Sequence, residues 1–390
     1  MTLGLTSVWI SLMLALPAFA GCGTSLPSNL TLRSNPRLPD PFAFYDGTRV
    51  TSQTDWACRR EEINELFQRI ELGTLPPKPE SVKGSITGST LTVDVSHAGK
   101  SITFAASIQL PPGSGPFPAI IALGGYSIPA PPGVAMIIFN NDDVASNGPS
   151  RGLGKFFTLY GSSYPAGALT AWAWGISRII DALETTPSSP IDLSKLGVTG
   201  CSRNARGALV AGALEPRIVL TIPQESGNGG AGCWRISDAQ QIIGPRPPVE
   251  VDPIQTLPWF SPSFGQYARR SNELPFDHHL LAAMVAPRGL LVIDHSAIDW
   301  LVPQSVFGCM KAANKVYQAL RIADNMGISQ VGAHNHCQFP SSQQSDLDAF
   351  VDKFLRGNVN ANTSIIRTDS PNNFGYSESQ WVDWATPTLS

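Results

Sequence analysis

The sequence predicts an α/β fold, a three-layer αβα sandwich with a mostly parallel central sheet and antiparallel strands at its N-terminal edge. The first observation is a series of short apolar runs without polar alternation, which suit parallel strands buried on both faces. These runs occupy residues 119–123, 135–139, 196–199, 219–222 and 290–293. The second observation is helical periodicity between the runs, clearest at residues 168–183, where apolar side chains share one face. Strands that alternate with helices favour a parallel sheet joined by right-handed crossovers.

The N-terminal part of the chain supplies the edge of this sheet. An irregular, proline-rich start extends to about residue 40, and residues 55–72 are expected to form a helix. Residues 81–110 then alternate apolar and polar side chains between Gly and Ser turns, which predicts antiparallel strands. A last helix is expected where apolar residues recur at helical spacing, at Leu347, Phe350, Val351 and Phe354.

The organisation of the chain predicts one secreted domain. Residues 5–20 are apolar and end in Ala18-Phe19-Ala20, so residues 1–20 are expected to be a signal peptide, although no positive charge precedes the apolar run. No stretch in the middle has the composition of a linker, and residues 21–390 are expected to form a single catalytic domain. No other run is long enough to span a membrane. The protein is therefore expected to be extracellular, where disulfides persist.

The charge pattern argues against nucleic acid as a partner. The formal net charge is −3, only 15% of the residues are charged, and the sequence has no cluster of basic residues that could bind along a phosphate backbone. Nothing suggests a subunit interface, so a monomer is expected. Two tripeptides, at Asn29 and Asn362, are candidate N-glycosylation sites in a secreted protein.

A candidate nucleophile lies in the segment GCSRN at residues 200–204. Ser202 stands between an apolar strand-like run and a helix-like run at residues 205–214, which is the setting of a nucleophile elbow in an α/β-hydrolase fold. The pattern is incomplete, because Asn204 occupies the place of its second glycine. The alternative is that Ser202 is a plain helix N-cap.

Two later residues complete a serine, acid, histidine order, which is the order found in α/β-hydrolases. Glu225 follows the apolar run at 219–222, and His336 precedes the last predicted helix. Asp294 is a rival acid at the end of a predicted strand, and His334 is a rival base. The loop at residues 124–127 could add an oxyanion N–H, and the polar loop at 140–143 lies beside another strand end.

The cysteines add a geometric hint. Cys201 precedes Ser202 and Cys337 follows His336, so a bridge between these cysteines would hold nucleophile and base close together. Six cysteines can pair in many ways, and the count does not choose between them.

Five segments together resemble the glucuronoyl esterases of carbohydrate esterase family 15, the 4-O-methyl-glucuronoyl methylesterases. They are VTGCSRN at 198–204, PQESG at 223–227, CWRISD at 233–238, LPFDHH at 274–279 and HNHC at 334–337. The resemblance extends from Asn29 to Trp384. It implies an α/β-hydrolase fold and a serine esterase mechanism.

The resemblance also implies roles for individual residues. Ser202 would be the nucleophile, His336 the general base and Glu225 the acid that orients it. Arg203 would stabilise the oxyanion, and Trp300 would contact the sugar. The implied disulfides are Cys22–Cys58, Cys201–Cys337 and Cys233–Cys309.

Two departures concern the sugar-binding residues. Arg206 stands where the fungal enzymes have a lysine, which keeps the charge at this substrate-binding position but changes its shape. Between Asp238 and Trp259 the family has a glutamine and a glutamate that bind sugar hydroxyls, and ungapped counting places Pro248 and Thr256 there. The candidates to replace them are Gln241, Glu250 and Gln255.

The resemblance implies hydrolysis of the ester between 4-O-methyl-glucuronic acid of glucuronoxylan and a lignin alcohol, and no cofactor is expected. No metal is expected, because the adjacent His278 and His279 would point to opposite faces of an extended stretch and no third ligand stands at zinc spacing. Trp172 and Trp174 are expected in the core, and Trp259 and Trp300 as sugar platforms. The alternatives are an acetyl or feruloyl esterase, or a carbohydrate-binding homologue with impaired catalysis.

Overall fold

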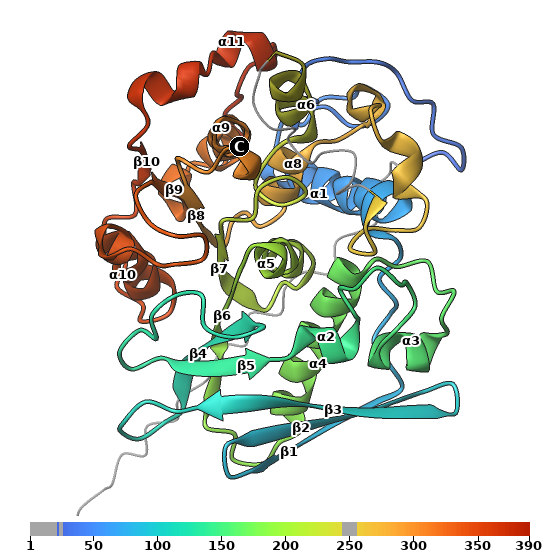
Figure 1. The fold of residues 1–390 in the computed structure, drawn as a ribbon, viewed down its shortest axis with the longest axis vertical. Helices are drawn as coiled ribbons and strands as arrows, with labels where there is room; N and C mark the ends of the chain where they lie inside the picture. The colour runs from blue at the N-terminus through green and yellow to red at the C-terminus, as the bar shows by residue number, and fades with distance from the viewer. Residues whose placement is uncertain (1–21, 23–25, 244–255) are drawn as a thin grey trace, which may run out of the picture.

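The computed structural model describes residue 22 and residues 26–243 and 256–390, and these residues form a central sheet flanked by helices (Figure 1). The sheet has ten strands in the order β1-β2-β3-β5-β4-β6-β7-β8-β9-β10. Strands β1, β2, β3 and β5 pair in an antiparallel manner, and all the other neighbours are parallel. The predicted fold class, a mostly parallel sheet with antiparallel strands at the N-terminal edge, is confirmed.

Strand β5 coincides with its predicted apolar run, and β4, β6, β7 and β8 extend theirs by one to five residues at an end. Their bounds are β1 Ser81–Thr87, β2 Thr90–His97, β3 Lys100–Gln109, β4 Phe117–Leu123, β5 Ala135–Phe139, β6 Ile191–Cys201, β7 Ile218–Gln224, β8 Gly289–His295, β9 Met326–Val331 and β10 Ile366–Thr368. Strands β9 and β10 have no counterpart among the predicted runs. In β9, Ser329 and Gln330 are fully buried, so the strand does not read as continuously apolar.

The longer helices are α1 Gln53–Phe67, α4 Ala168–Thr185, α5 Arg203–Leu214, α6 Trp234–Ile243, α9 Pro303–Ala319 and α10 Gln344–Phe354. The short helices are α2 Asn141–Val144, α3 Lys155–Tyr160, α8 His278–Ala283 and α11 Glu378–Trp381. The single turns are η1 Gln68–Leu72, η2 Phe264–Tyr267, η3 Ser271–Glu273, η4 Asp299–Leu301, η5 Ala323–Asn325, η6 Ser341–Gln343 and η7 Pro371–Gly375. The helix predicted at 55–72 is thus α1 followed by the π-helical turn η1, which ends at Gly73 with φ 76°.

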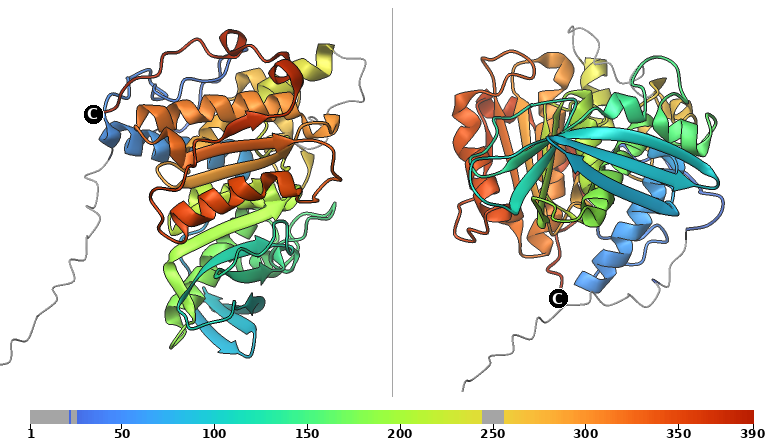
Figure 2. Two further views of the ribbon diagram at one scale, coloured as in Figure 1. Left: turned by 90° about the vertical axis from the view of Figure 1, so that its left-hand side faces the viewer. Right: turned by 90° about the horizontal axis from the view of Figure 1, so that it is seen from below.

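The sheet is buried on both faces, as expected for parallel strands. In β4, Ala119, Ile121 and Leu123 belong to one apolar cluster, while Ile120 and Ala122 belong to another. The first cluster includes side chains of α1, α4, α5, α8 and α9, among them the fully buried Trp172 and Trp174. The second cluster is closed by α10, which lies on the other face of the sheet (Figure 2, left). The sheet is therefore the middle of three layers.

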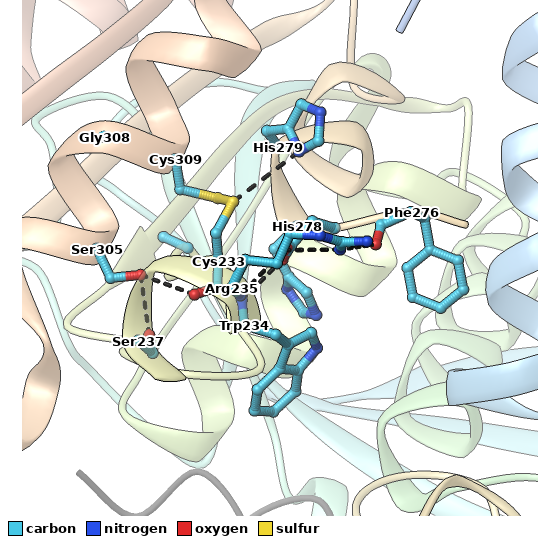
Figure 3. The surroundings of a disulfide bond; sticks show 12 residues. Cys233, Trp234, Arg235, Ser237, Phe276, His278, His279, Ser305, Gly308 and Cys309 are labelled. Atoms are coloured by element: carbon cyan, nitrogen blue, oxygen red, sulfur yellow. Dashed lines mark hydrogen bonds and ion pairs between the residues drawn. A yellow bond between two sulfur atoms is a disulfide. The ribbon is translucent and has the colours of Figure 1, made fainter. Parts of the chain in front are cut away.

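Three disulfides tie the described residues together, at Cys22–Cys58, Cys201–Cys337 and Cys233–Cys309. These are the pairs that the resemblance implies. Around Cys233–Cys309, the Ser305 hydroxyl donates a hydrogen bond to the Cys233 carbonyl oxygen over 2.8 Å, which further joins α9 to the start of α6 (Figure 3). Arg235 extends this joint toward α8, because its guanidinium pairs with Asp277 at 3.2 Å.

The predicted signal peptide at residues 1–20 lies outside the described residues. Within the described part of the chain, none of the helices combines the length and the apolarity needed to cross a bilayer.

Candidate active site

Ser202 occupies a strained turn between β6 and α5. Its backbone has φ 59° and ψ −125°, a conformation that is costly for a residue with a Cβ. Its N–H donates to the Gln224 carbonyl oxygen over 3.0 Å, which fixes the turn against the end of β7. Although Ser202 stands at the N-cap position of α5, its side chain makes no capping hydrogen bond. The hydroxyl is therefore not used to cap the helix, and the turn has the geometry of a nucleophile elbow.

The local packing explains why this elbow has one glycine rather than two. A Cβ on Gly200 would lie 2.7 Å from the backbone carbonyl atoms of Asn204, so the first glycine is required. An asparagine is accommodated at position 204 because its side chain occupies the space that Gly124 leaves open. A Cβ on Gly124 would overlap the Asn204 amide nitrogen. Asn141 in α2 donates to the Asn204 side-chain oxygen over 3.0 Å. The two loops singled out in the sequence, 124–127 and 140–143, thus both support the elbow.

Glu225 follows β7 directly and is fully buried. Its backbone also has a positive φ, 51°, and its N–H donates to the Ile293 carbonyl oxygen over 2.8 Å. The carboxylate oxygen Oε2 accepts two hydrogen bonds, from His336 Nδ1 at 2.7 Å and from the Cys337 N–H at 2.8 Å. A buried carboxylate needs such donors, because an unpaired charge in the interior is costly.

The His336 imidazole bridges this buried carboxylate and the surface, since 27% of its side chain is exposed. Because an ionised carboxylate can only accept, Nδ1 carries the proton of the neutral imidazole and Nε2 is left as an acceptor. The Trp300 ring meets the imidazole edge to face, with 4.7 Å between the centroids and 77° between the planes. The histidine is thus held in the tautomer that a general base requires.

Ser202 and His336 line one cleft of about 290 Å³. The lining residues are Leu123, Gly124, Gly125, Tyr126, Ser127, Cys201, Ser202, Arg203, Asn204, His336 and Cys337. The Cys201–Cys337 disulfide holds the two neighbouring backbones together, with 5.7 Å between the Cα atoms. Arg203, the first residue of α5, is exposed at this cleft and brings a positive charge to it. The cleft is therefore lined by a serine, a histidine and an arginine.

The rival base and the rival acid lie outside this set of lining residues. The His334 side chain is only 3% exposed, and its two nitrogens lie 3.0 and 3.1 Å from the carbonyl oxygens of Asn335 and Val331. Asp294 is fully buried and accepts a hydrogen bond from Gln330 Nε2 at 2.7 Å. Burial, together with the nearby Glu225 carboxylate, raises the pKa of Asp294 well above its ordinary value. Among the described residues, the geometry thus favours His336 and Glu225.

The residues expected to bind sugar are only partly gathered. Trp300 is 47% exposed beside His336. Arg206 is 5% exposed, donates from Nε to the Asn228 carbonyl oxygen at 2.6 Å, and places its guanidinium 4.8 Å from the centre of the Trp259 ring. Thr256 is exposed, and its carbonyl oxygen accepts from Arg151. Pro248, Glu250, Gln255 and the Gln241 side chain lie outside the described residues.

His278 and His279 begin α8 and do not stand in an extended stretch. The expectation that an extended backbone turns their side chains to opposite faces is therefore wrong. Each is engaged by the protein itself. His278 contacts the Gly230 carbonyl oxygen and the Glu71 carboxylate. Burial alone would lower the pKa of His278, but the Glu71 carboxylate outweighs it, so the pKa is raised. Burial lowers the pKa of His279 to about 4.

Among the described residues, one group of four has metal-ligand types close together, namely Cys201, Glu225, His336 and Cys337. The two cysteines form a disulfide and cannot supply thiolates. One carboxylate and one imidazole remain, already bonded to each other.

Sequence reasoning missed the buried pair of Glu71 and His278, in which His278 Nε2 lies 2.8 Å from Glu71 Oε1. Glu71 Oε2 also accepts from the Trp234 indole N–H at 3.0 Å. The sequence offers one signal for this pair: Glu71 stands among apolar residues at the end of the first predicted helix. Helical periodicity alone would assign such a glutamate to the solvent-exposed face. The pair links η1 to α8, and His278 Nδ1 in turn lies 2.6 Å from the carbonyl oxygen of Gly230, in the segment that follows Glu225.

The comparisons with known proteins agree with this geometry. The family model described as glucuronyl esterase of fungi matches residues 93–321. A 4-O-methyl-glucuronoyl methylesterase of Hypocrea jecorina is 56% identical over 370 residues, which cover 94% of this chain and 79% of that protein.

Solved structures give the same result. The glucuronoyl esterase catalytic domain of Hypocrea jecorina matches with a TM-score of 0.89 at 56% identity, covering 94% of this chain and 100% of that one. A serine-to-alanine mutant of the glucuronoyl esterase of Sporotrichum thermophile, in complex with methyl 4-O-methyl-β-D-glucopyranuronate, matches with a TM-score of 0.89 at 47% identity and covers 94% and 99%. The chain therefore belongs to the glucuronoyl esterase family, a family of carboxylic ester hydrolases with the α/β-hydrolase fold.

Proposed function

We propose that this chain hydrolyses esters of 4-O-methyl-D-glucuronic acid through a triad of Ser202, His336 and Glu225. The observation that carries the proposal is the 2.7 Å hydrogen bond between His336 Nδ1 and the buried Glu225 carboxylate, at a cleft that Ser202 also lines. A strained turn presents the serine. One disulfide, Cys201–Cys337, has a cysteine next to each of the two reacting residues and ties their backbones together. These features fit nucleophilic catalysis at an ester carbonyl.

In the first half of the reaction, His336 Nε2 takes the proton of the Ser202 hydroxyl as Oγ forms a bond with the ester carbonyl carbon. The carbonyl oxygen becomes an oxyanion. Collapse of this tetrahedral intermediate breaks the carbon–oxygen bond to the alcohol, which leaves with the proton from His336. The product is a glucuronoyl ester of Ser202.

In the second half, His336 deprotonates a water molecule that attacks the acyl-enzyme. Collapse returns the proton to Ser202 and releases the free uronic acid. Glu225 stays ionised throughout and stabilises the imidazolium form of His336 that arises twice in each cycle.

The oxyanion is held by backbone N–H groups at the start of α5 and in the loop at residues 124–127. Arg203, which is exposed and lines the same cleft, adds a full positive charge. Donors placed where charge develops stabilise the transition state more than the ground state.

The relatives' names indicate which side of the ester carries the sugar. They are 4-O-methyl-glucuronoyl methylesterases, and one solved relative holds a methyl ester of this uronic acid. For this chain we assign the glucuronic acid branch of glucuronoxylan as the acyl group and a lignin alcohol as the leaving group. Trp300 would contact the sugar ring, and Arg206 would support that side of the site through Trp259.

The same proposal includes secretion of a monomer with glycans at Asn29 and Asn362. The three disulfides suit an oxidising compartment, and both asparagines are exposed. A mass shift on treatment with an endoglycosidase tests the glycans.

The function is tested by comparing kcat/KM on methyl 4-O-methyl-glucuronate, acetylated xylan and methyl ferulate. Preference for the uronate ester supports the proposal. Preference for acetylated xylan or ferulate indicates the alternative esterases, and binding of glucuronoxylan without cleavage of any ester indicates a binding protein.

A further inference from the structure

One aromatic ring at the cleft has no role in the chemistry above. Tyr126 follows β4, is 50% exposed, and lines the same cleft as Ser202 and His336. The other large apolar side chains that are strongly exposed among the described residues are Leu110, Leu153, Trp300, Val359 and Ile366. Of these, only Trp300 also lies at the site, against His336. Tyr and Trp rings, which combine a large apolar face with a polar group, are enriched at binding interfaces.

Tyr126 is held in place by its surroundings. Its hydroxyl donates a hydrogen bond to the side-chain oxygen of Gln109 at the end of β3. The next residue, Ser127, is bonded through its hydroxyl to Thr199 of β6 at 3.0 Å. The loop begins with the Gly124 N–H donating to the Phe139 carbonyl oxygen over 2.9 Å. A ring fixed in this way loses little conformational entropy when a ligand packs on it.

The strand order places Tyr126 and Trp300 on opposite sides of Ser202. Tyr126 follows β4, which neighbours β6 on one side, and Trp300 follows β8, which lies two strands away on the other side. Ser202 stands at the end of β6 between them. Ser202, where the ester would react, thus follows a strand that lies between the strands preceding these two exposed aromatic residues.

We propose that Tyr126 forms a subsite for the aryl group of the leaving alcohol. The inference rests on the proposed function, in which Trp300 and Arg206 serve the sugar. Neither of these residues lines the cleft in the described part of the chain, so that volume remains for the oxyanion and the alcohol. The alcohol oxygen must lie near His336, which protonates it, and the cleft extends from His336 and Cys337 to Tyr126.

The dimensions and chemistry of the cleft suit an uncharged aryl alcohol. Its volume of about 290 Å³ is near the lower end of the range in which proteins bind small organic molecules. No described atom lies within 4 Å of the place where a Cβ on Gly125 would stand, so the wall is open backbone between Gly124 and Tyr126. Among the described residues that line the cleft, Arg203 is the one lysine, arginine, aspartate or glutamate, and the proposed mechanism assigns it to the oxyanion.

The experiment compares kcat/KM for the benzyl and methyl esters of glucuronic acid in the wild type, Tyr126→Ala, Tyr126→Phe and Val359→Ala. An aromatic pair adds about three- to tenfold in affinity, so Tyr126→Ala should lower the benzyl-to-methyl ratio by about that factor. Tyr126→Phe keeps the ring and should retain most of the ratio. Val359→Ala removes an apolar side chain elsewhere that is 80% exposed, against 50% for Tyr126, and should leave the ratio at the wild-type value.

The inference is overturned if Tyr126→Ala cleaves both esters with the wild-type ratio, or if Tyr126→Phe loses as much of the ratio as Tyr126→Ala. Failure of the wild type to cleave either ester is a different result, because it removes the proposed function and the subsite with it.

Discussion

His336 and Glu225 are 111 residues apart in the chain, yet His336 Nδ1 lies 2.7 Å from the Glu225 carboxylate. The same carboxylate oxygen accepts the Cys337 N–H, so the acid fixes both the ring and the backbone of the histidine loop. Because Nδ1 is engaged by Glu225, Nε2 is the ring nitrogen left to accept a proton from Ser202, which lines the same cleft as His336.

Glu225→Gln should lower kcat by roughly 10³- to 10⁴-fold, because the amide can donate to Nδ1 and favour the wrong tautomer. The variant keeps the volume of the side chain, so folding should persist. Steady-state kinetics on the benzyl ester and a thermal melt measure both. A variant with near wild-type kcat would exclude Glu225 as the acid of the triad.

Asp294→Asn is the matched test of the rival acid. The raised pKa of Asp294 means that the folded state favours the neutral carboxyl, so the wild type loses stability as the pH rises above the unfolded pKa of about 4. The asparagine variant lacks this loss. We expect it to keep most of its kcat and to become more stable than the wild type as the pH rises from 4 to 7. Loss of activity comparable to that of Glu225→Gln would instead make Asp294 part of the catalytic relay.

Arg203→Ala should lower kcat by roughly 10²- to 10³-fold, the usual effect of losing one oxyanion donor. The side chain is exposed, so the free energy of unfolding should change little. Arg33→Ala, which removes an exposed arginine near the N-terminus, is the control for a general charge effect. Similar kinetics for the two variants would argue against a role for Arg203 at the oxyanion.

The Cys201–Cys337 disulfide should matter to turnover as well as to stability. Its closed loop, with a sequence separation of 136, is worth about 5 kcal/mol in the chain-entropy model, against about 4 kcal/mol for Cys22–Cys58 with a separation of 36. Replacing both cysteines of either bridge by serine should therefore lower the melting temperature. Only Cys201→Ser with Cys337→Ser should also lose kcat below its melting temperature, because only this bridge joins the backbones of nucleophile and base. Equal kcat values in the two variants would show that the bridge is merely structural.

The sequence was most informative where one local rule decides the structure. Apolar runs buried on both faces predicted β4 to β8, and the GCSRN turn predicted the elbow at Ser202. Strand β9 was not predicted, because the burial of its polar residues Ser329 and Gln330 depends on hydrogen bonds to distant partners. These partners are Asp346 and Asp294, respectively. The role of Asn204 was equally hidden, since its side chain fits only because Gly124, some 80 residues earlier, lacks a Cβ. The Glu71–His278 pair depends on a contact between segments 207 residues apart, which no local pattern contains.

The most direct test of the proposed nucleophile is the rate of benzyl glucuronate cleavage by the wild type and by Ser202→Ala, with thermal melts to verify that both are folded. We expect the wild type to cleave the ester and the variant to lose at least about 10³-fold in kcat. Equal rates for the two proteins would contradict the assignment of Ser202 as the nucleophile, and with it the triad proposed for this chain.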